Sequence, residues 1–225
     1  MAAIELPAAH HLPLVTAYLD ARLALVEAVL ERAVDPAAGA RIVDPRPALA
    51  EALAAAVAAG VDLPDAQLAR RCALTPAAID LLWLCVAPVL DPTLLGILRR
   101  FDGTARDWVD LAVAARTLAA SRADRQALYA DLALDAPLRR AGLVRVAPIE
   151  QPGRRELVPA TWLPAALRGR RALGARLEGL AALVTPTITP ADVPLPERAR
   201  ELVQFLAGVA VDAPEARFEQ AGLDH

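Results

Sequence analysis

Residues 144–158 read VRVAPIEQPGRRELV and contain two short runs of strand-forming residues. The first run, residues 144–146, places its two valines on one face and Arg145 on the other, as in a strand that has one face on a core. The second run is residues 156–158. The turn-forming residues between the runs are Pro148, Pro152 and Gly153. The pattern predicts a two-stranded β-hairpin.

The chain on both sides of this hairpin has the pattern of helices. Apolar residues recur at spacings of three and four from Val15 to Leu30, which predicts a helix over residues 13–34. Thr75-Pro76 is a good helix start, and residues 79–86 are apolar on every side, so we expect a buried helix that Pro88 ends. A single hairpin within a helical chain is typical of a winged-helix domain. We therefore predict a mostly α fold, a helical bundle with a winged-helix domain that carries one small β-hairpin.

Further signals divide the chain into three regions. Ser121 followed by Asp124 predicts a capping box and a helix as far as residue 134. A long helix is expected from Pro164 to Val184, followed by a proline-rich connector and a short helix over residues 196–207. We predict N-terminal helices in residues 1–60, a winged-helix domain with its following helix in residues 61–184, and a connector, short helix and tail in residues 185–225.

The composition excludes many kinds of catalytic site. The chain has no lysine, no asparagine and a single serine, Ser121, which is better explained as a helix cap. Without lysine there is no P-loop and no Schiff-base chemistry. The three histidines lie near the termini, and no spacing predicts a metal site. We therefore expect no enzyme activity, no cofactor and no metal, although an enzyme of unrecognised type stays an alternative.

Membrane association and secretion are not indicated. The uncharged runs are far shorter than the ~20 residues that cross a bilayer. The N-terminus has no basic residue before its apolar stretch, unlike a signal peptide. Cys72 and Cys85 are the only cysteines, both in apolar helical context, and we expect buried reduced thiols. These features predict a cytoplasmic protein.

Charge is distributed unevenly along the chain. Nine arginines and two glutamates lie between Arg139 and Arg176, a local net charge of +7, whereas the whole chain has a net charge of -3. A basic region beside an acidic body favours an oriented partner-binding surface, and a solvated arginine-rich face is the alternative. Arginine suits such contacts because its planar group pairs with carboxylates and stacks on aromatic rings. The predicted partner-binding residues are Arg139, Arg140, Arg145, Arg154 and Arg155, of which the first two could instead favour a helix dipole.

Several short motifs resemble the N-terminal region of a group of bacterial AAA+ ATPases, including those found beside contractile injection systems. They occupy residues 35–39, 87–92, 102–111, 136–143, 162–169 and 195–197. The resemblance implies a variant winged-helix domain that recruits substrates or adaptors, with possible association with an ATPase ring. The chain stops about where the ATPase module would begin, so it is either part of a longer ATPase or a stand-alone relative.

Two binding functions follow from this sequence. The first is a non-catalytic protein-interaction domain, which the uneven charge favours. The second is winged-helix DNA binding, with residues 107–120 as the predicted recognition helix. That helix would expose Asp107, Asp110, Arg116 and Thr117. Its two acids would repel phosphates and only one arginine could contact bases, so we expect a protein partner rather than nucleic acid.

Overall fold

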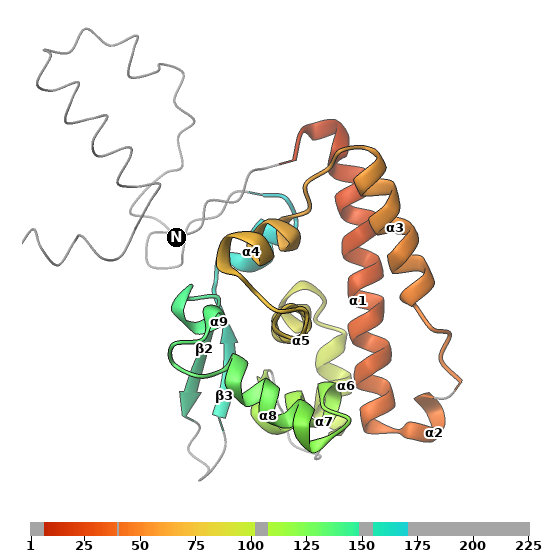
Figure 1. Cartoon of the computed structure of the whole chain (residues 1–225). Helices are drawn as coiled ribbons and strands as arrows, with labels where there is room; N and C mark the ends of the chain where they lie inside the picture. Colours follow the sequence, from red (N-terminus) through yellow and green to blue (C-terminus); the bar gives the residue numbers. More distant parts are fainter. Residues whose placement is uncertain (1–6, 40, 102–107, 149–154, 171–225) are drawn as a thin grey trace, which may run out of the picture. The chain divides into compact units, whose positions relative to one another are not determined.

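A computed structural model describes residues 7–39, 41–101, 108–148 and 155–170 (Figure 1). All of these belong to one compact unit that spans residues 2–181. The predicted connector, the predicted last helix and the part of the long helix beyond residue 170 lie outside the described residues. The described chain is mostly α-helical with a small antiparallel sheet, which confirms the predicted fold class.

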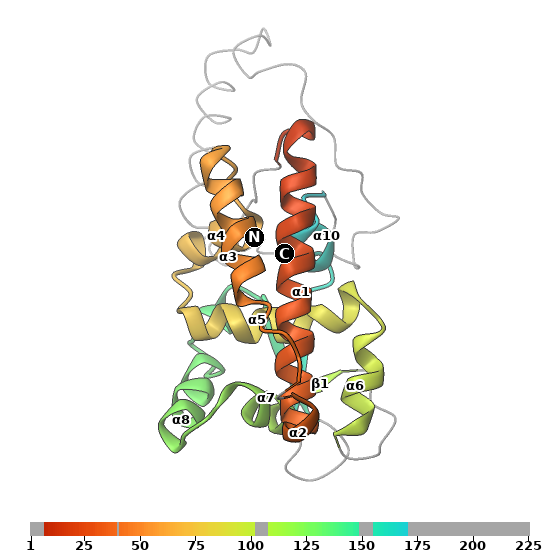
Figure 2. The same cartoon turned by 90° about the vertical axis from the view of Figure 1, so that its right-hand side faces the viewer.

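The N-terminal helices form a pair along one side of the unit. A 3-10 turn, Ala9–His11, leads into the long helix α1, Leu12–Val34, and the short α2, Pro36–Gly39, follows. Helix α3, Arg46–Ala58, lies beside α1 (Figure 2). The stripe predicted for α1 is confirmed, because Val15, Leu19, Val26 and Leu30 are buried and Leu23 packs against the core.

Helix α5, Pro76–Leu90, is the centre of the core, as its apolar sequence predicted. It follows α4, Pro64–Cys72, and contacts α1, α6 and α7 as well as strand β3. Thr75 caps its start, since its side chain accepts a hydrogen bond from the Ala78 amide at 3.0 Å. The expectation that Pro88 ends this helix was wrong. The helix continues to Leu90 with Pro88 buried inside it, so packing of the ring outweighs the loss of one backbone donor.

The second half of the unit alternates short helices and strands. Its elements are α6 Leu94–Arg100, β1 Val109–Asp110, α7 Leu111–Leu118, α8 Arg122–Asp131, α9 Pro137–Arg140, β2 Val144–Pro148, β3 Arg155–Pro159 and α10 Leu163–Leu167. The predicted capping box of α8 is confirmed: the Asp124 amide donates to the Ser121 hydroxyl and the Ser121 amide donates to the Asp124 carboxylate.

The predicted hairpin is confirmed, and a third strand joins it. The sheet order is β1-β3-β2, with both pairs antiparallel. In the register, Val146 and Val109 both pair with Leu157, which is fully buried. Leu157 therefore marks the face of the sheet that lies on the core, and Arg145, one residue out of step with Val146, is on the other face.

A short helix, α10, is what the structure describes at Pro164, and residues 173–184, which carry the stripe of the long helix expected after Pro164, lie outside the described residues. The helix stops at Leu167, and Gly169 has a φ of 67°, in the left-handed region that favours glycine. A side chain at this position would also come within 2.9 Å of Pro7. No described helix is by itself long and apolar enough to cross a membrane; α5 and α6 together pass on length and composition but are bent by 112°.

Candidate partner-binding surface

The element order is β1, α7, α8, α9, β2, β3, so only the short helix α9 separates α8 from the hairpin. In helix-turn-helix proteins the second helix is the one that contacts the ligand, and here that position belongs to α8. The helix predicted over residues 107–120 starts later than expected, at Leu111, and in this order it is the first helix of the pair. Val109–Asp110 pair with β3 as a strand, and the helix that follows, α7, is the supporting one.

Helix α7 uses its polar groups to fix itself to the core. The Asp110 side chain is 1% exposed and accepts a hydrogen bond from the Val113 amide at 2.8 Å. Arg116 lies over the Phe101 ring, 4.9 Å from its centroid, and donates to the carbonyls of Phe101 and Ala33. The Thr117 hydroxyl is buried. Asp110 and the Thr117 hydroxyl are thus buried, contrary to the expectation that they would be exposed, whereas Arg116 is exposed, as expected. Asp107 lies outside the described residues.

Helix α8 is the most exposed helix of this half of the unit. Leu128 is its one buried residue, and Tyr129 is 50% exposed. Arg122 and Arg125 are exposed near its start, and the formal charges of Asp124 and Asp131 balance them. Hydrogen bonds from Ser121 lower the pKa of Asp124, so this carboxylate is charged at neutral pH. The helix therefore presents mixed charge and one aromatic ring.

The arginines before the hairpin have different environments. Arg139 is half-buried, and its guanidinium donates to the Leu132 carbonyl at 3.4 Å, so it helps to close the turn after α8. Arg140 is exposed at the end of α9, close enough to the half-buried Cys72 to affect the pKa of its thiol, which burial raises. Of this pair, Arg140 is the one that is free to contact a partner through its charged group.

The hairpin arginines lie on opposite faces of the sheet. Arg145 pairs with Val158, and Arg155 pairs with Pro148, on the face of Leu157. Both are exposed. Arg154 lies outside the described residues. The structure thus separates the arginines that the sequence grouped, and their partner-binding role stays a prediction.

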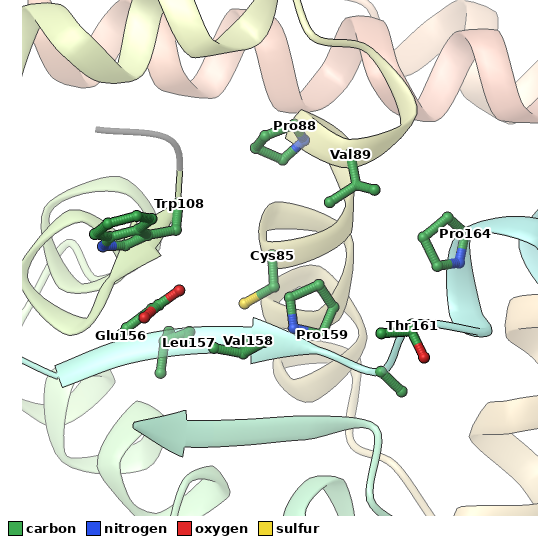
Figure 3. Close-up of a pocket in the computed structure, with 11 residues that line it drawn as sticks. Cys85, Pro88, Val89, Trp108, Glu156, Leu157, Val158, Pro159, Thr161 and Pro164 are labelled. Atoms are coloured by element: carbon green, nitrogen blue, oxygen red, sulfur yellow. The ribbon is translucent and has the colours of Figure 1, made fainter. Parts of the chain in front are cut away.

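An apolar groove opens at the edge of β3, beyond the first residue of β1 (Figure 3). Trp108 lies at one end and Pro164 at the other, with Val89 of α5 above Pro159. The groove has a volume of about 330 Å³. Trp108 and Val89 are 37% and 53% exposed. This groove was not predicted from the sequence, because its residues come from α5, β3, α10 and the segments beside them and share no local pattern.

A buried polar cluster holds α1, α4 and α5 together and was also not predicted. Asp65 is 3% exposed, and its Oδ2 accepts hydrogen bonds from the Tyr18 hydroxyl at 2.5 Å and from Trp83 Nε1 at 2.9 Å. The Arg22 guanidinium lies 3.6 Å from Asp65 and 3.3 Å from Asp80. Burial and the nearby Asp65 carboxylate raise the pKa of Tyr18. The cluster is structural, since each donor already has its acceptor.

No described part of the chain contains three or more potential metal ligands together. The two cysteines are free thiols, as expected, but Cys72 is only half-buried. Cys85 is buried, and the loss of solvent raises the pKa of its thiol to about 12. A thiol with that pKa is almost entirely protonated at neutral pH and is a poor nucleophile.

The family described as winged helix domain, variant, matches residues 26–161, which include α3 to β3. No curated protein and no solved structure matches the chain. Winged-helix domains bind proteins or nucleic acids. The chain belongs to the variant winged helix domain family.

Proposed function

We propose that this chain is a non-catalytic protein-interaction domain that binds its partner through α8 and the exposed arginines of the hairpin region. The observation that carries the proposal is the surface of α8, whose two arginines are balanced by two aspartates and which exposes Tyr129. Tyrosine and arginine are enriched in protein interfaces, because they combine apolar contact area with hydrogen bonding.

DNA binding is the second candidate. Arg122, Arg125 and Gln126 are exposed on α8 and have side chains that can contact base edges. Duplex DNA, however, presents closely spaced phosphates, and binding depends on an excess of positive charge. A helix without net charge in a chain of net charge -3 supplies little of that excess. The exposed hairpin arginines suit an acidic protein surface equally well.

The motif resemblance extends the proposal to an AAA+ setting. Residues 87–92 form the end of α5 and the turn into α6, and residues 136–143 form α9 and the approach to β2. The domain would recruit a substrate or adaptor to an AAA+ ATPase in the cytoplasm, either as a part of that ATPase or as a stand-alone relative. The chain has no lysine, so the nucleotide-binding lysine of such an ATPase would come from another segment or protein.

Two measurements on the whole chain test this function. The first is fluorescence anisotropy with a random-sequence DNA duplex at physiological salt. We expect no binding tighter than ~1 µM, the upper limit that is typical of non-specific DNA binding. Sub-micromolar binding that weakens steeply with salt would replace the protein-interaction proposal with the DNA-binding one.

The second measurement is capture of partners from nuclease-treated native lysate. The double variant Arg122→Glu, Arg125→Glu changes only exposed side chains of α8, and Arg46→Glu on α3 is the matched control. We expect the wild type and the control to capture the same protein and the α8 variant to lose it. Arg145→Glu tests the hairpin in the same way. Equal capture by all variants would contradict the assignment to α8 and the hairpin.

A further inference from the structure

The groove beside β3 has a distinctive edge. Strand β1 covers only the first part of β3, since Val109 pairs with Leu157 and no residue of β1 pairs with Pro159. Alternate residues of a strand direct their backbone groups to the same edge, so Pro159 is the next residue after Leu157 that faces the side of β1. Proline has no backbone N–H. A partner strand would find no donor there, so the groove is unsuited to strand addition.

The walls of the groove suit side chains instead. The part of the groove away from Trp108 is lined by three apolar side chains with little conformational freedom, Val89, Pro159 and Pro164 (Figure 3). The volume of about 330 Å³ is at the small end of the range for ligand pockets. Such a space accommodates a few apolar side chains of an extended chain.

One end of the groove carries a charge. Glu156 pairs with Asp110, and Val158, two residues further along β3, lies opposite the position of Trp108 in the continued register. Glu156 and Trp108 are therefore diagonal neighbours on the same face, and Figure 3 shows the carboxylate beside the indole. Neither the Glu156 carboxylate nor the Trp108 indole makes a hydrogen bond, ion pair or ring contact with a residue that the structure describes.

A cation that enters between these two groups would contact both. A positive side chain over an indole face gains a cation–π interaction, and the adjacent carboxylate adds an ion pair. Arginine fits better than lysine, because its flat guanidinium stacks on the ring while its N–H groups reach the carboxylate. A carboxylate in the same place would be repelled by Glu156.

We propose that this groove binds an extended segment of a protein partner in which an arginine is next to proline or aliphatic residues. The arginine would lie between Trp108 and Glu156, and the apolar residues would lie between Val89 and Pro164. The inference rests on the proposed function, since it assumes a protein partner, but it concerns a surface different from α8.

Selection from a phage-displayed library of short random peptides tests the specificity. With the whole wild-type chain as bait, we expect peptides with arginine beside proline or leucine to be enriched. With Glu156→Gln as bait the preference for arginine should fall, and with Trp108→Ala the enrichment should be lost. No enrichment with the wild type, or a consensus without arginine, would overturn the proposal.

Calorimetry with one synthetic peptide from the enriched set measures how much each variant weakens binding. We expect Trp108→Ala to weaken binding at least ~10-fold, as for a central aromatic contact, and Glu156→Gln ~3-fold or more. Val43→Ala is the control, an apolar residue that is 86% exposed and lies outside both the groove and α8, and it should leave the affinity unchanged. Equal losses in all three variants would overturn the assignment to the groove. If no peptide binds the groove but the wild type still captures a protein through α8, only the groove proposal is rejected. If the wild type captures no protein at all, the proposed function is rejected.

Discussion

Removal of the buried Asp65 carboxylate is predicted to destabilise the fold strongly. The change Asp65→Ala leaves the Tyr18 hydroxyl and Trp83 Nε1 without their acceptor in a site where Asp65 itself is 3% exposed. A buried donor without a partner costs ~1–3 kcal/mol, so two such donors predict a loss of ~2–6 kcal/mol.

Two features of the site reduce the loss of stability that is expected for Asp65→Ala. Arg22 keeps its contact with Asp80 at 3.3 Å, and its side chain is 17% exposed, so water can replace part of what it loses. Removal of a buried charge also recovers some of the free energy that its desolvation costs. We therefore expect the free energy of unfolding to fall by ~3 kcal/mol, with a smaller loss for Asp65→Asn, which retains one acceptor oxygen.

The matched control is Asp62→Ala. Asp62 also pairs with an arginine, Arg70, at 2.5 Å, but the two side chains are 48% and 61% exposed. An exposed ion pair contributes ~0–1 kcal/mol. Urea denaturation followed by circular dichroism measures both variants against the wild type. A loss for Asp65→Ala that is no larger than the loss for Asp62→Ala would refute the view that this cluster holds α1, α4 and α5 together.

Three further predictions concern α8, the cysteines and α7. Ser121→Ala should lower the free energy of unfolding by ~1 kcal/mol. The pKa of Asp124 is lowered in the folded state, so its carboxylate stabilises the fold at a pH above the unfolded pKa of ~4. This stabilisation is lost as the pH falls through the folded pKa. Denaturation at neutral and at acid pH should therefore show a smaller effect of Ser121→Ala in acid. In the native protein at pH 8, a thiol reagent followed by absorbance should modify the half-buried Cys72 first and Cys85 only on unfolding; equal rates would contradict the burial of Cys85. Thr117→Val should leave stability unchanged or raise it by up to ~1 kcal/mol in thermal denaturation, because the buried hydroxyl has no hydrogen-bond partner among the described residues, and a clear loss would indicate an unseen partner.

The elements with local signals were predictable from the sequence. The stripe of α1, the Thr75 cap and the capping box at Ser121 each depend on residues within one or two helical turns. The hairpin followed from two short strand runs around a proline-rich turn. These signals were sufficient for the fold class, which the structure and the family match both confirm.

The errors arose where tertiary contacts outweigh local preference. Strand β1 has two residues, and its partner β3 lies more than forty residues later, so no local pattern marks it. Because β1 was not predicted, the helix over residues 107–120 was predicted to start too early. The recognition helix was therefore assigned to α7 instead of α8. Pro88 stays inside α5 because the core packs around its ring.

The candidate surface was predictable only in part. Composition placed the arginines near the hairpin, but only the register shows that Arg145 and Arg155 are on opposite faces. The groove depends on Trp108, Glu156 and Pro164, which line one groove only after the chain has folded. Their types gave no signal in sequence, since single tryptophan, glutamate and proline residues are common in loops and strand ends.

The most direct test of the central claim, that α8 contacts a protein, is photo-crosslinking from its exposed face. A photoreactive amino acid in place of Tyr129, which is 50% exposed, reports what touches this helix, and the same group in place of Val43, which is 86% exposed, is the control. Irradiation in native lysate should give a discrete adduct from the α8 position alone, resistant to nuclease and identified as one protein by mass spectrometry. An adduct that carries nucleic acid and disappears with nuclease would contradict the account.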